Sequence, residues 1–177
     1  MKTFLLFTLL PVHIAIAGGE VGNGGQDVAL EFSTYGFTAA GQIEKSFYPG
    51  AGACLDAEFK DLCSLDAERV RDAVRSARIL ALPELTQQDP STGKTLAYVA
   101  LNFPQEQRIL VSEAEWARSE FCYVKRLPLV LHEYLGLLGL EIQNYRYSSL
   151  LSVWLMKTAG EDKFQGCPEL NSKGDRK

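Results

Sequence analysis

Histidine and cysteine are scarce in this chain of 177 residues, which holds two His and four Cys. Basic residues do not outnumber acidic ones: 18 Lys and Arg stand against 22 Asp and Glu, a formal net charge of −4. A protein dedicated to nucleic acid needs a basic face that displaces counterions from phosphates, so this balance argues against that function. With 46% hydrophobic and 23% charged residues, the composition is globular and excludes wholesale disorder, collagen and coiled-coil repeats.

The start of the chain lacks an apolar run long enough to cross a bilayer. Residues 4–10 are almost wholly apolar, but the run is short and Pro11 interrupts it. A basic residue precedes the run and the small residues of 15–17 follow it, as a signal peptidase requires. We therefore predict that residues 1–17 are a signal peptide cleaved after Ala17, and that the protein is exported to the periplasm or the extracellular space. A buried N-terminal helix is the alternative.

Export gives the few cysteines a role. Cys54, Cys63, Cys122 and Cys167 all lie after the predicted cleavage site. An even number of cysteines in an exported chain predicts two disulfides, for which three pairings are possible. We favour the local pair Cys54–Cys63, with Cys122–Cys167 tying the tail to the body. Zinc held by four cysteines is the alternative, but no CxxC pair is present and the compartment is oxidising.

The rest of the pattern predicts one α+β domain, residues 28–160. A flexible glycine-rich lead-in, residues 18–27, precedes it, and a polar tail, residues 161–177, follows it. Apolar side chains at three- and four-residue steps predict helices, and runs rich in β-forming residues predict a small, mostly antiparallel sheet. The predicted helices are 28–47, 65–80 with Ser64 or Asp66 as cap, 127–140 with Pro128 in the first turn, and one beginning at Ser148 or Ser149; the predicted strands are 79–85, 95–103 and 108–112.

Two ionisable residues, His132 and Glu133, lie in the middle of the most apolar of these helices. A helix that is apolar on every side is buried, so an imidazole and a carboxylate within it need partners. Gly136 and Gly139 share the face of His132, and each Gly costs a helix about 1 kcal/mol relative to Ala. Something therefore needs room there: a metal, a water or a closely packed helix. Glu141 follows Gly139, where a glycine turn folds its carboxylate back toward His132.

The segment HEYLGLLGLE resembles the zinc-binding motif HExxHxxGxxH of the metzincin peptidases. The resemblance implies that His132 is a first zinc ligand, Glu133 the general base and Gly139 the turn that follows the helix. Gly136 and Ile142 stand where the second and third histidine ligands belong. Because the mature chain holds no other His, a three-His site is impossible.

We therefore expect a non-catalytic exported protein without a cofactor, which binds an unidentified protein or envelope component or supports the envelope. The alternative is a zinc-dependent hydrolase or peptidase, with His132 and Glu141 as metal ligands and Glu133 as the catalytic residue, since zinc accepts carboxylate oxygens. The glycine-rich start of the mature chain and the HEYLG block are also similar to a set of small exported bacterial proteins, and this likeness implies export and a shared fold.

Further polar and aromatic residues have two interpretations each. In the non-catalytic interpretation, Glu133 pairs with a buried arginine such as Arg108 or caps backbone amides. Trp116 is expected to pack in the core or at its rim rather than to recognise a partner. A last group offers hydroxyls beside His132 or forms an aromatic loop followed by a serine cap: Tyr145, Tyr147, Ser148 and Ser149.

Overall fold

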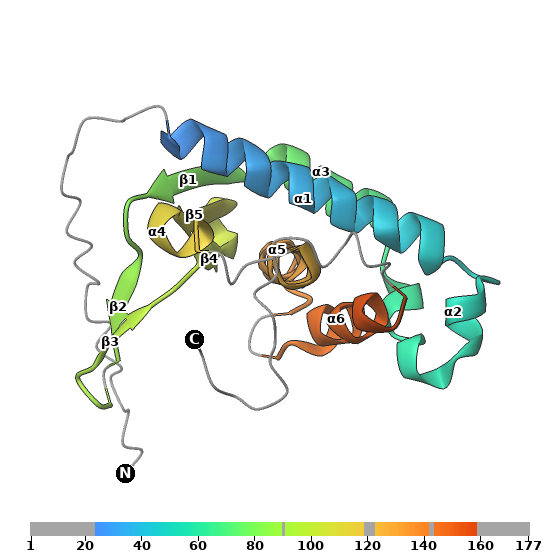
Figure 1. Cartoon of the computed structure of the whole chain (residues 1–177). Coiled ribbons are helices and arrows are strands. Elements are labelled where there is room, and N and C mark those ends of the chain that lie inside the picture. Colours follow the sequence, from blue (N-terminus) through green and yellow to red (C-terminus); the bar gives the residue numbers. More distant parts are fainter. Residues whose placement is uncertain (1–23, 90, 119–122, 142–143, 159–177) are drawn as a thin grey trace, which may run out of the picture.

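The computed structural model describes residues 24–89, 91–118, 123–141 and 144–158 (Figure 1). They form one α+β domain, as predicted, in which helices outweigh strands. None of the helices in these ranges is long and apolar enough to cross a membrane. The elements are α1 (Gly24–Ser46), α2 (Gly52–Leu55), η1 (Ala57–Phe59), η2 (Leu62–Ser64), α3 (Ala67–Ser76), β1 (Arg78–Leu82), β2 (Thr86–Gln88), β3 (Thr95–Ala97), β4 (Ala100–Phe103), η3 (Pro104–Glu106), β5 (Arg108–Ser112), α4 (Glu113–Trp116), α5 (Tyr123–Leu137) and α6 (Arg146–Thr158).

The strands form two small sheets rather than one. The larger has the order β1-β5-β4, with β1 parallel and β4 antiparallel to β5, while β2 and β3 pair as an antiparallel hairpin. Antiparallel pairing therefore predominates, as predicted, but the predicted strand 95–103 is divided between the two sheets. The hydrogen bonding changes from one sheet to the other in the middle of this segment. The Tyr98 amide donates to the Leu85 carbonyl, and the Val99 carbonyl accepts from the Ser112 amide.

Helix α3 is shorter than the helix predicted for residues 65–80. Its N-cap is Asp66, as predicted, whose carboxylate accepts hydrogen bonds from the next turn's amides. The helix ends at Ser76, because Ala77 is extended and the chain continues directly into β1. The apolar spacing of the sequence does not distinguish the end of this helix from the strand, and the pairing of β1 with β5 decides the boundary.

Helix α1 lies along one side of the domain, across β1 and beside α3 (Figure 1). It begins at Gly24, so residues 24–27 are helical and their assignment to the flexible lead-in was wrong. Gly36 lets α1 approach α5 closely: a Cβ atom at Gly36 would lie 2.4 Å from Cε2 of Tyr134, which is too short for any contact between carbon atoms. The glycine that weakens the helical pattern of the sequence is thus required by packing.

The core has two parts that share α1 and α5. One part joins them to α6 and to the segment around η1 and η2, and the other joins them to the inner face of the larger sheet. Trp116 lies in the second part and is buried, as expected for a packing residue. Its indole Nε1 donates to Glu31, and the guanidinium of Arg126 donates to both Glu31 and the Trp116 carbonyl. These contacts fasten α4 between α1 and α5.

The predicted disulfide Cys54–Cys63 is present and links α2 to η2. The segment that it closes also holds α6, through ion pairs of Arg146 with Asp61 and of Lys157 with Glu58. The predicted partners Cys122 and Cys167 lie outside the described residues, as do the predicted signal peptide and the polar tail.

Candidate functional site

His132 and Glu133 lie in α5, which packs against α1, β4 and α6. Both are buried, as predicted from the apolar sequence around them. The helix begins at Tyr123, earlier than predicted, so Pro128 lies inside the helix rather than in its first turn. Proline removes one helical hydrogen bond, but burial of nearly every side chain from residue 127 to 137 supports the helix at that point.

Glu133 is held by a side chain of the sheet. Nδ2 of Asn102, in β4, donates a hydrogen bond of 2.7 Å to Oε2 of Glu133. The predicted pairing of Glu133 with Arg108 is wrong, because Arg108 lies over the ring of Phe103 and pairs with a surface carboxylate. Glu133 accepts from the side-chain amide of Asn102 in the neighbouring strand instead, and the backbone of Asn102 also acts on its carboxylate.

The space beside Gly136 is occupied by Asn102. A Cβ atom at Gly136 would lie 2.4 Å from Nδ2 and 2.6 Å from Cγ of Asn102, so any side chain there would displace the amide that binds Glu133. The sequence left open whether a metal, a water or a closely packed helix needs this space. In the structure a packed strand, β4, occupies the space with Asn102. Asn102 was not identified from the sequence, because no local spacing links residue 102 to a helix thirty residues later.

The turn expected at Gly139 is present. Gly139 has a φ of +70°, which favours glycine, and its amide donates to the carbonyl of Gly136. The Leu140 amide donates to the carbonyl of Leu135, which completes a Schellman motif at the end of α5. This turn reverses the chain and returns Glu141 to the side of His132.

Glu141 joins His132 to the start of α6. Its Oε2 lies 3.2 Å from Nδ1 of His132, an ion-pair contact in which the ring N–H is not aimed directly at the oxygen. Its Oε1 accepts hydrogen bonds from the amides of Tyr147 and Ser148, at 2.8 and 3.2 Å. Glu141 is 0% exposed. A fully buried carboxylate therefore caps α6 and faces the imidazole at the same time.

The aromatic and serine residues at the start of α6 have different roles from those predicted. The helix begins at Arg146, before the serines, and the carboxylate of Glu141 caps it instead of a serine hydroxyl. The ring of Tyr145 stacks on the His132 ring with 4.2 Å between centroids. Tyr145 thus meets His132 through its face, whereas Ser148 is buried and its amide, not its hydroxyl, binds Glu141.

The surroundings of His132 and Glu133 change their protonation. Burial lowers the pKa of His132, but the Glu141 carboxylate and the charge of Glu133 outweigh it, and the pKa lies above the ordinary value of 6.5. Burial raises the pKa of Glu133 above its ordinary value of 4.5, although the Asn102 hydrogen bond and His132 oppose the rise. The imidazole is therefore stabilised as a cation by Glu141, while Glu133 is less acidic than an exposed carboxyl.

These residues do not fit a zinc site. Within the described ranges, no group of three His, Cys, Asp or Glu side chains is arranged to hold a metal ion. Catalytic zinc takes three protein ligands and structural zinc takes four, but among the residues that the structure describes only His132 and Glu141 are in contact at this place. One oxygen of Glu141 is already bound to backbone amides, and Glu133 is bound to Asn102. Ile142, at the position of the third metzincin ligand, lies outside the described residues.

Comparison with known proteins adds no assignment to this geometry. No protein-family model matches the chain, and the searches of curated proteins and of solved structures find no significant match. The function must therefore be argued from the contacts of these side chains.

Proposed function

We propose that this chain is an exported, non-catalytic protein that acts by binding another protein or an envelope component. In this proposal His132, Glu133 and Glu141 maintain the fold instead of carrying out a reaction. The observation that carries it is the double use of Glu141, whose two carboxylate oxygens face His132 and the first amides of α6. Because one oxygen of Glu141 is bound to two backbone amides, this carboxylate could supply a metal with a single oxygen ligand only.

The contacts of Glu133 support the same conclusion. A general base must reach a water or a substrate proton within hydrogen-bond distance. Glu133 is buried, and its Oε2 accepts from Asn102, a side chain whose place is kept by Gly136. Glu133 and Gly136 of α5 and Asn102 of β4 therefore form a buried contact that connects this helix to the sheet.

Export is supported by the pattern of residues 1–17 and by the Cys54–Cys63 disulfide, which an oxidising compartment maintains. N-terminal sequencing of the protein recovered after secretion from its host tests this part of the proposal. The expected first residue is Gly18. A protein that keeps Met1 and stays in the cytoplasm would contradict export.

The non-catalytic part is tested by metal analysis of the purified protein, with His132→Ala as the matched variant. We expect no stoichiometric zinc in either protein. Stoichiometric zinc that disappears in His132→Ala would establish the alternative, a zinc-dependent hydrolase that uses His132, Glu133 and Glu141. Glu133→Gln separates the two functions further: a structural Glu133 predicts a changed melting temperature, whereas lost hydrolysis with unchanged melting would contradict the proposal.

A further inference from the structure

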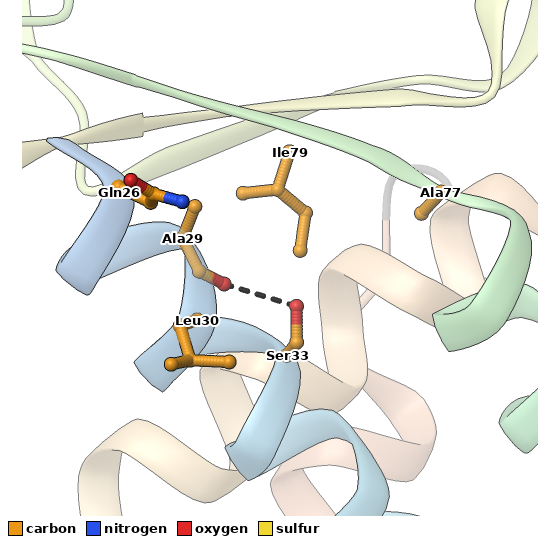
Figure 2. A pocket seen from close by; sticks show the side chains of 6 residues that line it. All are labelled: Gln26, Ala29, Leu30, Ser33, Ala77 and Ile79. Carbon is orange, nitrogen blue, oxygen red and sulfur yellow. Dashed lines mark hydrogen bonds between the residues drawn. The ribbon is translucent and has the colours of Figure 1, made fainter.

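The helices around the larger sheet all pack on one of its two faces. Ile79 of β1 points toward α1 and lines a groove with it (Figure 2). The register places Ile109 beside Ile79 and Asn102 beside Ile109, and Asn102 binds Glu133 of α5. Helices α1 and α5 therefore cover the same face. Because the side chains of a strand alternate between faces, the residues next to these in each strand point away from both helices.

The opposite face, which we name the outer face, carries an apolar row. The register places Leu80, Leu110 and Leu101 side by side across the three strands. Leu110, in the central strand, is 4% exposed, but Leu80, in an edge strand, is 39% exposed. The described helices in extended contact with these strands are α1, α4 and α5, and all three pack into the core on the other face. The residues of the outer face are Arg78, Leu80, Leu101, Phe103, Arg108 and Leu110.

Positive charge lies at one end of the leucine row. Arg78 and Arg108 are register partners, so both project from the outer face on neighbouring strands, where like charges repel. Arg108 pairs with Glu106 and lies over the Phe103 ring, 4.8 Å from its centroid. Arg78 is exposed and has no ion-pair partner within the described part of the chain. The outer face thus offers an unpaired cation beside apolar side chains, in a chain whose net charge is −4.

We propose that the outer face binds one amphipathic helix of a partner protein. The apolar stripe of that helix lies on the leucine row, and an acidic side chain at its end pairs with Arg78. A carboxylate fits this position because it accepts two parallel hydrogen bonds from a guanidinium group and offsets the repulsion between the two arginines. The helix is the partner in the proposed binding function, on which its assignment rests.

The size of the outer face favours a single helix over a second copy of the chain or a membrane. Strands β1 and β5 have five residues each, so the face is about 17 Å long and, across two strand spacings, about 10 Å wide. That width is about the diameter of one helix. The resulting area of about 170 Å² is far below the roughly 800 Å² that each partner of a stable complex of globular proteins buries. A membrane surface attracts clusters of about four to eight basic residues, whereas this face has Arg78 and Arg108.

Selection from a displayed library of crosslinked helical peptides, with the purified protein as the target, tests the proposal. We expect the enriched sequences to share apolar residues at steps of three and four and Asp or Glu at one end. Selection against Arg78→Glu should enrich Lys or Arg at that end instead, because the charge on the protein is reversed. Arg69→Glu is the matched control, since Arg69 is exposed on α3 and also lacks an ion-pair partner among the described residues. It should enrich the same acidic sequences as the wild type.

Fluorescence anisotropy of one enriched peptide then locates the surface that it binds. Leu80→Asp should weaken binding by about tenfold or more, because it places a charge in the apolar row. Leu55→Asp should leave binding unchanged, since Leu55 is 83% exposed on α2. Circular dichroism checks that both variants fold, and Arg78→Glu supplies the same measurement at an exposed position if Leu80→Asp unfolds.

An absence of enriched sequences, or an acidic preference that Arg78→Glu leaves unchanged, would overturn the outer face as the binding surface. Vesicles of phosphatidylglycerol that bind the wild type but not Arg78→Glu, without any peptide binding, would replace the helix by a lipid surface. Metal analysis of the same protein separates these failures from a failure of the proposed function. Stoichiometric zinc would contradict the non-catalytic function whether or not a peptide binds, whereas zinc-free protein without a bound peptide would overturn the outer face alone.

Discussion

Nδ1 of His132 and Oε2 of Glu141 lie 3.2 Å apart, although Glu141 comes after the end of α5. The Gly139 turn produces this contact, and the second oxygen of Glu141 extends it to α6. One buried carboxylate therefore determines how the last two helices meet.

Glu141→Ala should lower the free energy of unfolding by about 3 kcal/mol, because it uncaps α6 and leaves a buried imidazole without its counter-charge. Urea denaturation measures the loss. Asp61→Ala is the matched control, since Asp61 also binds α6 but through an exposed ion pair with Arg146, and exposed pairs contribute little. Equal losses for the two variants would show that Glu141 does not hold α6.

Gly136→Ala should destabilise the protein by about 2 kcal/mol, because the added Cβ overlaps the Asn102 side chain. Gly41→Ala is the control: no atom lies within 4 Å of its added Cβ, so removal of a helical glycine should stabilise by up to about 1 kcal/mol. A double-mutant cycle with Asn102→Ala, followed by urea denaturation, checks the cause. If the penalty of Gly136→Ala is the same without the Asn102 side chain, the overlap is not its origin.

Stability should fall as the pH rises from mildly acidic to alkaline values. The pKa of His132 is raised in the folded protein, so its contribution is fully present below 6.5 and is lost as the pH passes the folded value. The pKa of Glu133 is also raised, so the penalty of its burial grows as the pH rises above 4.5. Urea denaturation at a series of pH values measures this fall.

The matched variant for the pH series is His132→Asn, which removes the titrating ring. It should lose the part of the fall that follows the raised pKa of His132 and keep the part that follows the raised pKa of Glu133. A variant whose pH profile matches that of the wild type would refute the assignment to His132.

Replacement of both Cys54 and Cys63 by Ser should cost about 3 kcal/mol, the loop-closure estimate for so short a loop. The reason is that the crosslink restricts the unfolded chain. Thermal melting of the oxidised protein and of the double variant measures the difference, and peptide mapping without reduction identifies the crosslinked peptide. Two separately alkylatable thiols at these positions in the purified, unreduced protein would contradict the disulfide.

The features predictable from the sequence depend on neighbours along the chain. The Asp66 cap, the Gly139 turn and the Cys54–Cys63 pair each involve residues close in sequence, where spacing and residue type constrain the geometry. The return of Glu141 toward His132 follows from the same turn. Local chemistry alone was enough for these four features.

The features that the sequence did not reveal depend on contacts between distant segments. The parallel pairing of β1 with β5 ends α3 early, and Asn102 reaches Glu133 from another element. Neither has a local signal, because any strand could have supplied the partner. Proline is common in the first turn of a helix, which is why the sequence predicted Pro128 there. In the structure Pro128 lies inside α5, where the buried packing of the helix offsets the lost hydrogen bond.

The close approach of Gly36 to Tyr134 has a consequence for the order of folding. These residues are separated by about 100 positions, so the contact closes a long loop and carries a large entropic cost before it contributes any stability. Helix α1 can pack against α3 and β1 early, but its contact with α5 forms only after α5 has been synthesised. A nascent chain of this design stays without a completed core until late in translation, and such a delay would suit the export that we propose, because translocation requires an unfolded chain.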